Sequence, residues 1–397
     1  YKLLIYRRLN INLTQYCKMK EKYFVVADSI SKWKIDNSFE RNLSYLADKY
    51  EFWKILYVLF YKIVSYKYYK KGIELANVQI DRQWATIDEE IKKYLKRKVL
   101  VRDMIYCLHR FGTSFEEYFV FKYYERNYIG RSSFNNLKRQ YGFCQLVNDS
   151  NIRELFEDKG ALYKKLKNYY KRDLVVVYND SQKNELAEFL LKHTSFIYKP
   201  LKGHSGQGIK IYRNYKLGIS LFDDVIKYGP FVVEELIEQG DELAVIHKES
   251  INTVRLVTFK VKNNVHIIGG ALRMGVGAST VDNAGAGGIY ASIDTNAGFV
   301  NSMACDNINN HYSIHPNSSC KIVGFDLPQW NQAITMVNEM AMKCGGATVI
   351  AWDLAYSKKG WLVIEGNDVG EPYLLQAPLQ IGMKSALIRL LDLYFSK

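Results

Sequence analysis

The stretch VIAWDLAYSKKGWLVIEGNDVGEP, residues 349–372, contains two β-rich apolar runs joined by a short polar segment. If residues 358–360 form a three-residue hairpin loop whose glycine takes a positive φ, Asp353 lies directly opposite Glu365. Asn367 then points to the same face, because side chains alternate along a strand. A two-residue loop would instead put the two acids on opposite faces.

This pairing places two carboxylates and an amide on one half-buried face. Like charges directly opposite each other destabilise a sheet, so the arrangement predicts a bound cation that supplies the missing charge. Oxygen-only ligands favour Mg²⁺, or Mn²⁺, over Zn²⁺. The alternative is that one acid points to solvent and Asn367 only shapes a turn. The hairpin by itself leaves both interpretations open.

Composition narrows the classes of protein. The chain has 397 residues and 48% hydrophobic content, which excludes a disordered chain and allows two or three units with cores. Its formal charge of +14 favours an anionic partner such as a nucleotide, a nucleic acid or a membrane surface. The six cysteines form no CxxC pair, which favours a reducing compartment over a disulfide framework or a zinc site. With no apolar run of about 18 residues and no signal-peptide pattern, we expect a cytoplasmic protein.

The first 150 residues are rich in Tyr, Lys, Phe and Leu and predict a mostly helical, basic N-terminal region, residues 1–150. Within it, EFWKILYVLFYKIVSYKYYKK, residues 51–71, interleaves lysines with large apolar side chains. Such a segment can lie on an anionic membrane surface, which would give peripheral membrane contact. A core helix whose lysines extend their charged ends to water is the favoured alternative.

A glycine-rich segment, YKPLKGHSGQGIKIY, covers residues 198–212. Gly206 and Gly208 would let backbone amides close around phosphate oxygens, and Ser205 adds a hydroxyl donor. Lys199 stands just before the loop. The segment is neither a Walker nor a Rossmann loop, because it lacks GK[ST] and is followed by a strand-like run. A tight turn without a ligand is the alternative.

The next segment, FVVEELIEQGDE, ends a predicted strand with residues able to hold an adenine edge. These are Glu234, Glu235, Leu236 and Ile237, and Glu242 could accept hydrogen bonds from ribose hydroxyls. Taken in isolation, the acids are typical of a solvated loop. The order of glycine-rich loop, hinge, basic residues and paired acids favours a nucleotide site instead.

That order resembles the ATP-grasp superfamily. The resemblance implies that Lys159, in the helix-opening Asp158-Lys159, and Lys199 contact ATP phosphates. It also implies that residues 234–237 form the adenine hinge, and that a magnesium triad consists of Asp353, Glu365 and Asn367.

Within the superfamily, SINTVRLVTF, LRMGVG and VDNAGAGGIYASID resemble the sugar-transfer associated ATP-grasp proteins of bacterial polysaccharide gene clusters. The implied fold is α+β, with two ATP-grasp subdomains, residues 151–245 and 246–397, that grip ATP behind the helical region. Residues 1–90 match no pattern of the family, which leaves the donor and acceptor sites undefined.

The resemblance implies an ATP- and Mg²⁺-dependent carboxylate–amine ligase that acts through an acyl phosphate. It would attach an amino acid or another carboxylate to a nucleotide-linked or lipid-linked sugar in capsule or other surface polysaccharide biosynthesis. Arg273 would neutralise the transferring phosphoryl group, Arg255 would serve the same pocket or the substrate carboxylate, and Asn283 would touch phosphate or substrate.

Two other functions remain open at this stage. One is a phosphotransferase that uses the same ATP site. The other is a non-catalytic basic binding protein, although the lack of arginine–aromatic RNA motifs argues against nucleic acid as a partner.

Overall fold

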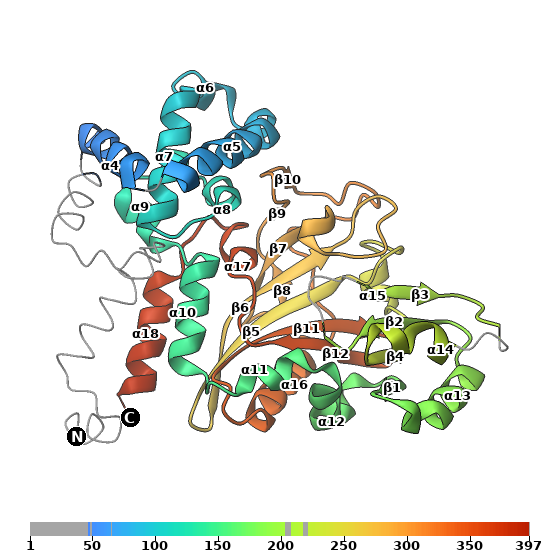
Figure 1. Ribbon diagram of the computed structural model, residues 1–397. Helices are drawn as coiled ribbons and strands as arrows, with labels where there is room; N and C mark the ends of the chain where they lie inside the picture. Colours follow the sequence, from blue (N-terminus) through green and yellow to red (C-terminus); the bar gives the residue numbers. More distant parts are fainter. Residues whose placement is uncertain (1–46, 48–49, 65, 203–207, 217–220, 397) are drawn as a thin grey trace.

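The computed structural model describes residues 47, 50–64, 66–202, 208–216 and 221–396 (Figure 1). Expectations that concern the first 46 residues lie outside this part of the chain. Helices of the N-terminal region gather at one end of the molecule, a small sheet lies at another, and a large sheet lies between them. Among the described residues, no helix combines the length and hydropathy that a membrane span needs.

The described part of the N-terminal region is helical, as the sequence predicts. Its α-helices are α4 (Glu51–Val64), α5 (Tyr66–Gln83), α6 (Glu89–Lys92), α7 (Arg97–Arg110), α8 (Phe115–Val120), α9 (Tyr128–Ser133) and α10 (Leu137–Val147). A buried ion cluster joins four of them, α4, α7, α8 and α9: Asp103 accepts bidentate hydrogen bonds of 2.8 and 2.7 Å from Arg131, and it also accepts from Lys54 and Tyr118.

The small sheet has four antiparallel strands in the order β1-β4-β2-β3. They are β1 (Leu174–Val177), β2 (Phe196–Pro200), β3 (Lys210–Tyr212) and β4 (Phe231–Glu235). Helices α13 (Lys183–Lys192) and α14 (Leu221–Val225) share a hydrophobic core with it. Helices α11 (Ile152–Glu157) and α12 (Lys159–Tyr170) contribute to the core of the large sheet instead.

The large sheet runs β10-β9-β7-β6-β5-β11-β12, and β8 pairs with β7. Its strands are β5 (Thr253–Val261), β6 (Asn264–Met274), β7 (Ile289–Asp294), β8 (Phe299–Val300), β9 (Ala304–Cys305), β10 (His311–Tyr312), β11 (Val349–Ser357) and β12 (Gly360–Asn367). Helix α16 (Trp330–Lys343) packs on one face, and α10 and α18 (Lys384–Phe395) pack on the other. Short helices α15 (Asp241–Ala244) and α17 (Tyr373–Gln376) flank the sheet.

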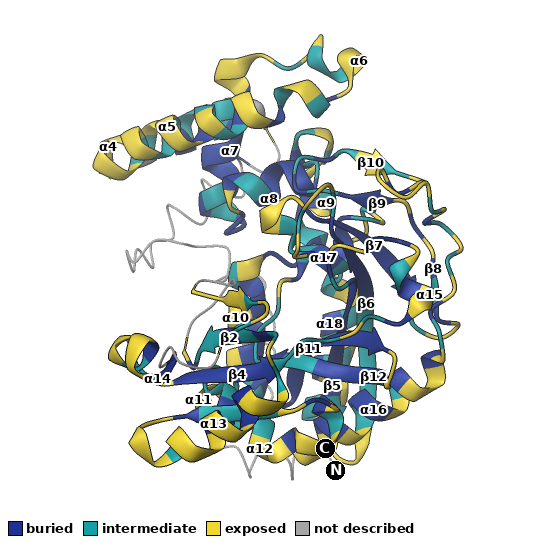
Figure 2. Cartoon of the chain, turned by 90° about the vertical axis from the view of Figure 1, so that its right-hand side faces the viewer, coloured by how far each residue is buried: buried dark blue, intermediate teal, exposed yellow. Residues whose placement is uncertain are grey.

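Both faces of β11 are covered, and every residue of the strand is buried (Figure 2). Ile350, Trp352 and Leu354 belong to the α16 side of the sheet, whereas Val349 and Ala351 belong to the α10–α18 side. Side chains alternate along a strand, so Asp353 lies on the α10–α18 face. It is the charged residue of a strand that is otherwise suited to burial on both faces.

The hairpin confirms the predicted pairing of Asp353 with Glu365, but the predicted loop is wrong. Ser357 pairs with Gly360, so the loop contains two residues rather than three. A two-residue loop alone would place the acids on opposite faces, and a register shift after Asp353 corrects this. The shift inserts one extra residue into β12, a β-bulge that brings the two acids back onto one face.

The N-terminal helices and the large sheet share one core. Buried side chains of α7 and α8 cluster with Ala271 of β6, Tyr290 of β7 and Leu374 of α17. Polar contacts add to this packing, because Gln83 donates a 2.9 Å hydrogen bond to the carbonyl oxygen of Asn307. The helical region is therefore held against the sheet.

We expect Gly370→Ala to lower the free energy of unfolding by about 2–4 kcal/mol, through backbone strain and overpacking. Gly370 has φ +69°, and an added Cβ would lie 2.5 Å from the Cβ of Ala351 in β11. Gly345→Ala is the matched control, because its Cβ would meet nothing within 4 Å. Urea unfolding of both variants measures the difference, and equal stabilities would contradict this account of Gly370.

Candidate functional site

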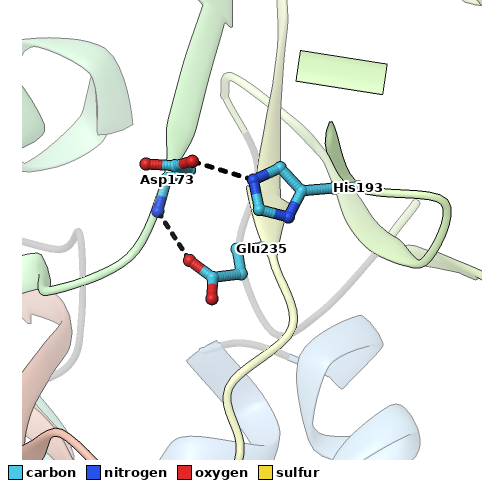
Figure 3. A group of neighbouring side chains, drawn as sticks. All are labelled: Asp173, His193 and Glu235. Carbon is cyan, nitrogen blue, oxygen red and sulfur yellow. Dashed lines mark hydrogen bonds and ion pairs between the residues drawn. The ribbon is translucent and has the colours of Figure 1, made fainter. Parts of the chain in front are cut away.

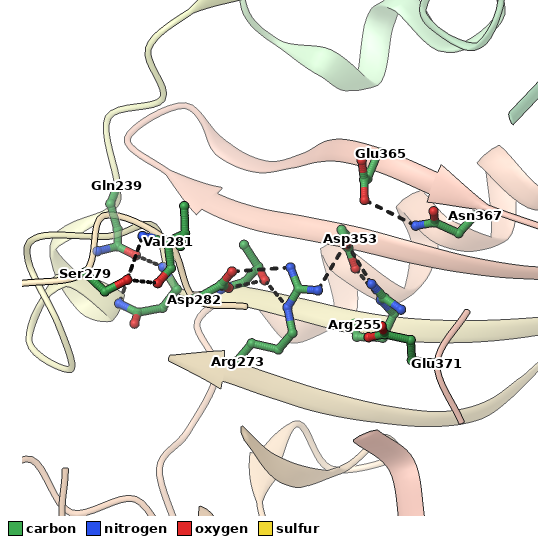
Figure 4. A network of polar contacts seen from close by, with 12 residues as sticks. Gln239, Arg255, Arg273, Ser279, Val281, Asp282, Asp353, Glu365, Asn367 and Glu371 are labelled. Atoms are coloured by element: carbon green, nitrogen blue, oxygen red, sulfur yellow. Dashed lines mark hydrogen bonds and ion pairs between the residues drawn. The ribbon is translucent and has the colours of Figure 1, made fainter. Parts of the chain in front are cut away.

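Two arginines surround the carboxylate of Asp353 (Figure 4). Arg255, its partner across the β5–β11 ladder, contacts it through Nε and through Nη2, the latter 3.0 Å from Oδ2. Arg273 of β6 places Nη1 3.3 Å from the same Oδ2. The sequence analysis predicts that a metal cation neutralises the paired acids. At Asp353, two guanidinium groups already supply positive charge.

These ion pairs keep Asp353 ionised although it is buried. Burial by itself would raise its pKa, but Arg255 and Arg273 hold the pKa below its ordinary value. Burial likewise opposes the charge of Arg255, yet Asp353 raises the pKa of Arg255. All three groups therefore depend on one another, because an unpaired buried charge is costly.

Thr253 and Asp282 complete the surroundings of Arg273. Its Nε donates a 2.8 Å hydrogen bond to Oγ1 of Thr253, and its Nη2 lies 3.4 Å from Oδ1 of Asp282. Asp282 also accepts a 3.0 Å bond from the backbone N–H of Thr253. The next residue, Asn283, is half-buried and uses its carbonyl oxygen to accept from the amides of Ala286 and Gly288, while its side chain makes no capping bond.

Glu365 is the second acid on this face, and its charge is less compensated. Burial and the neighbouring Asp353 raise its pKa. Its amide contact is Nδ2 of Asn367, 3.4 Å from Oε1, and it forms no ion pair within the described ranges of the chain. A half-buried carboxylate beside an asparagine side chain is a donor set that suits a hard divalent cation.

Lys159 at the start of α12 and Lys199 in β2 lie close enough to Glu365 for their charges to act on it. Asp158 caps the start of α12, accepting from the amides of Gly160 and Ala161, so that Lys159 is the first helical residue. Its Nζ lies 3.3 Å from the carbonyl oxygen of Leu201. Burial lowers the pKa of Lys159, and the nearby carboxylate of Glu365 opposes this lowering. Cations of α12 and of the small sheet thus lie near an acid of the large sheet.

Glu234 differs from its expected role at an adenine edge. It lies in the central strand β4 and pairs with β1 on one side and β2 on the other, so its backbone groups are used by the sheet. Its buried carboxylate accepts from Arg172 at 2.7 Å and forms a 2.8 Å ion pair with Lys199. Burial would raise its pKa, but Lys199 and Arg172 lower it to about 2. Glu234 therefore positions Lys199.

The hinge after β4 contains the remaining expected residues. Leu236 and Ile237 are half-buried, and their backbone groups form no hydrogen bond with other described residues. Glu242, exposed in α15, lies with Oε1 3.5 Å from the hydroxyl of Tyr356. This segment also contacts β11, because Gly240 donates a 2.9 Å bond to the carbonyl oxygen of Tyr356.

Of the glycine-rich loop, Ser205 and Gly206 lie outside the described residues. Gly208 has φ +75°, and an added Cβ would lie 2.8 Å from Cγ of Pro200. A residue other than glycine would therefore strain the return of the loop onto β2.

A comparison with models of protein families identifies the family of this chain. The model of the sugar-transfer associated ATP-grasp family matches residues 138–390. The chain belongs to this family. Its α+β architecture is accordingly the ATP-grasp fold, preceded by a helical region, as the resemblance in the sequence implied.

Solved ATP-grasp structures are similar at low identity. The ATP-grasp ligase PsnB in complex with a minimal precursor is 10% identical, with a TM-score of 0.38, and the alignment covers 62% of this chain and 64% of PsnB. VanG D-Ala:D-Ser ligase from Enterococcus faecalis is 12% identical over 62% of this chain and 64% of its own, with a TM-score of 0.41. D-Alanine-D-alanine ligase from Helicobacter pylori is 15% identical, with a TM-score of 0.36, and the alignment covers 60% of this chain and 58% of the ligase. No curated protein gave a significant match.

Glu235, the other acid of the predicted hinge, belongs to a separate cluster of this ATP-grasp protein (Figure 3). Asp173, His193 and Glu235 hold ligand-type atoms within 4.8 Å of one another. These groups already have protein partners. Nε2 of His193 lies 2.8 Å from Oδ2 of Asp173, and the backbone N–H of Asp173 donates to the carboxylate of Glu235. Glu235 also forms a 3.0 Å ion pair with Lys359. The cluster joins the small sheet to the tip of the β11–β12 hairpin.

Three further residues of the site were not predicted. Arg172 follows α12 and donates to Glu234, and Thr253 opens β5 beside Arg273. Glu371 is exposed, lies beside Arg255, and raises the pKa of both arginines. Thr253 occurs in the quoted motif SINTVRLVTF, so a sequence signal existed for it. The roles of the other two depend on contacts between distant segments.

We expect Asp353→Asn to lower the free energy of unfolding by about 3–5 kcal/mol, because Arg255 and Arg273 would lose their shared buried counter-ion. Glu365→Gln, one strand away, should instead maintain or raise stability at neutral pH, since it removes repulsion between two carboxylates. Chemical denaturation of the pair tests this. A larger loss in the Glu365 variant would contradict the assignment of the arginines to Asp353.

The pKa of Glu234 predicts a pH dependence. Its folded pKa of about 2 lies below its ordinary value of 4.5, so its ionisation stabilises the protein above pH 4.5 and this contribution is lost as the pH falls toward 2. Glu234→Gln should lower stability at pH 7 by about 3 kcal/mol. The difference from the natural protein should narrow between pH 5 and about 3 in denaturation experiments. A constant difference would show that another group controls this window.

Proposed function

We propose that the protein is an ADP-forming carboxylate–amine ligase that acts through an acyl phosphate. The observation that carries the proposal is the grouping of two cations, Lys159 at the capped start of α12 and Lys199 held by Glu234, near Glu365 of the β11–β12 hairpin. Membership of the ATP-grasp family supports it. A triphosphate held between these groups would have cations on one side and metal-binding oxygens on the other.

Lys159 and Lys199 are our candidates for the contacts to ATP phosphates, together with Ser205, Gly206 and Gly208 of the glycine-rich loop. Lys199 is held by Glu234, which makes its ammonium group a positioned charge. The open backbone groups of Leu236 and Ile237 suit an adenine edge, and Glu242 suits a ribose.

Mg²⁺, or Mn²⁺, would be held by Glu365 and Asn367, with Asp353 as the adjoining charge. When bound, the ion would neutralise phosphate oxygens. Glu365 fits this role because it is half-buried and its pKa is raised by burial and by Asp353, both of which a cation would offset. Asp353 fits less well as an equal ligand, because its two oxygens already contact Arg255 and Arg273.

In the reaction, a substrate carboxylate oxygen attacks the γ-phosphorus, and the bond from this phosphorus to the leaving ADP breaks. The amine nitrogen then attacks the acyl carbon, an amide bond forms, and inorganic phosphate leaves with the bonding electron pair. Arg273 would stabilise the negative charge of the transferring group, with Arg255 beside it and Asn283 at the rim. Glu371 faces this pocket from the edge and is our candidate to bind the incoming amine and take its proton.

The family's description supports a sugar substrate. We propose that the carboxylate is an amino acid or a similar acid, and that the amine belongs to a nucleotide-linked or lipid-linked sugar of a surface polysaccharide. We place the reaction in the cytoplasm, where ATP and free thiols are available.

The test is a screen of carboxylates with ATP, Mg²⁺ and hydroxylamine, which traps an acyl phosphate as a hydroxamate. We expect hydroxamate and ADP with the correct acid, and a loss of at least about a hundredfold in rate for Lys199→Ala or Glu365→Gln. Lys183→Ala and Glu339→Gln are controls on exposed helices. Asp353→Asn is a poor test, because it also removes the counter-ion of two buried arginines.

A phosphotransferase is the second candidate, since the same ATP site would serve a hydroxyl acceptor. When a sugar with a free hydroxyl is supplied as acceptor, a phosphotransferase would form ADP and a stable phosphate ester. It would form no hydroxamate. If the protein fails to bind ATP and instead binds oligonucleotides with a steep salt dependence, it is a non-catalytic basic protein and the ligase proposal is wrong.

A further inference from the structure

The outer side of helix α4 carries an apolar stripe. Phe52 is 63% exposed, Ile63 is 82% exposed, and exposed Leu59 lies between them. Their spacings of seven and four residues place them on one side of the helix. The opposite side packs inward, since buried Tyr57 and Val58 belong to the core and Tyr57 contacts the ring of Tyr106 at 5.4 Å.

The stripe continues into the first turn of α5, where Tyr66 and Tyr68 are 62% and 66% exposed. Exposed lysines lie next to these tyrosines in the sequence: Lys62, Lys67, Lys70 and Lys71. The sequence from Phe52 to Ile73 contains no acidic residue. In Figure 2, α4 and α5 lie at the edge of the molecule with long exposed stretches. We call the exposed side chains of this segment the basic aromatic face: Phe52, Leu59, Lys62, Ile63, Tyr66, Lys67, Tyr68, Lys70 and Lys71.

The inner side of α4 fits the favoured expectation of a core helix with lysines at its margin, because Tyr57 and Val58 are core residues. The outer side differs from a plain core helix, because Phe52 and Ile63 are large apolar side chains that lie exposed. Helix α4 has 14 residues, fewer than the roughly 20 that a membrane span needs. An amphipathic helix that lies in the interface of a bilayer needs apolar and aromatic side chains on its outer face and cations beside them.

We propose that the basic aromatic face binds the surface of an anionic lipid bilayer. The apolar side chains of α4 enter the boundary between headgroups and acyl chains, and tyrosines sit at headgroup level. The lysines pair with anionic headgroups. A nucleic acid would also attract the lysines, but it offers no apolar phase for Phe52, Leu59 and Ile63. The proposal stands apart from the ligase reaction, because none of these residues belongs to the site.

The helical region is packed against the large sheet, so a bilayer bound by this face would hold the catalytic part at a fixed height. Asn307 illustrates this connection, because it accepts from Gln83 at the end of α5 and donates to Glu116 of α8. If the acceptor is a lipid-linked sugar, the same surface brings it to the enzyme.

The test is co-sedimentation of the full chain with vesicles of phosphatidylcholine alone and of equal parts phosphatidylcholine and phosphatidylglycerol. We expect binding to the anionic vesicles only, weakened by salt. Each lysine near an anionic surface contributes about fivefold in partitioning, so Lys67→Gln, Lys70→Gln and Lys71→Gln together should weaken binding on the order of a hundredfold. Phe52→Ser with Ile63→Ser should weaken it by at least about tenfold.

Two sets of control variants match these changes on other helices. Lys164→Gln, Lys165→Gln and Lys167→Gln remove three exposed charges from α12, and Leu191→Ser removes a 67% exposed leucine from α13. Neither set should alter vesicle binding by more than about twofold, because these side chains lie away from the basic aromatic face and the attraction to an anionic surface falls off within a Debye length. Circular dichroism and light scattering verify that every variant folds and show its oligomeric state.

Several results would overturn the proposal. Equal binding to both vesicle types, or an equal loss in the α12 controls, would show a general charge effect. Displacement of bound protein by an oligonucleotide would assign the face to nucleic acid. A dimer that dissociates in the α4 variants would show that a second copy covers the face. ATP turnover is measured in parallel, so failure here is distinguished from failure of the ligase proposal.

Discussion

The structure depends on the neutralisation of one buried carboxylate. Asp353 lies in the middle of a strand covered on both faces, where an unpaired charge would cost several kcal/mol. Arg255 and Arg273, from the two strands beyond it, converge on this acid, and Asp282 and Thr253 hold Arg273 in turn. The cluster orders three adjacent strands at the place where the paired acids meet the approaching lysines. A metal at Glu365 would therefore extend an existing array of charges.

The small sheet repeats this principle. Glu234 is also a buried acid paired with two cations, Lys199 and Arg172. Arg172 also donates to the carbonyl oxygen of Val363, at 2.8 Å, in the β12 strand. Arg172 thus links the acid that holds Lys199 to the hairpin that carries Glu365. Contacts of this kind fix the small sheet against the large sheet beside the candidate site.

The surface of the helical region carries its positive charge differently from the candidate site. Lys199 and the arginines of the candidate site are positioned by ion pairs with acids, whereas the lysines of the basic aromatic face are exposed and lie in a segment without acidic residues. Under the two proposals, the site would bind one small anion with positioned charges, and the face would bind an extended anionic surface.

Much of the site can be found in the sequence, since Lys159, Lys199 and the acids Asp353 and Glu365 stand at positions that the fold brings together. The sequence even predicts the pairing of Asp353 with Glu365, although by the wrong loop, because a β-bulge has no reliable local pattern. For Glu234 the sequence motif predicted an adenine contact. The structure shows that its backbone pairs with neighbouring strands and that its carboxylate pairs with Lys199, and neither contact could be predicted from the motif.

Periodicity, glycine placement and the order of motifs determine the α+β elements and the family, because these depend on residues close together in the chain. The partners of Asp353 are 98 residues away at Arg255, and those of Glu234 are 62 residues away at Arg172. Such pairs form only when strands are placed side by side and water is removed. Which acids are neutralised by arginine and which is left for a metal was therefore decided by the tertiary structure alone.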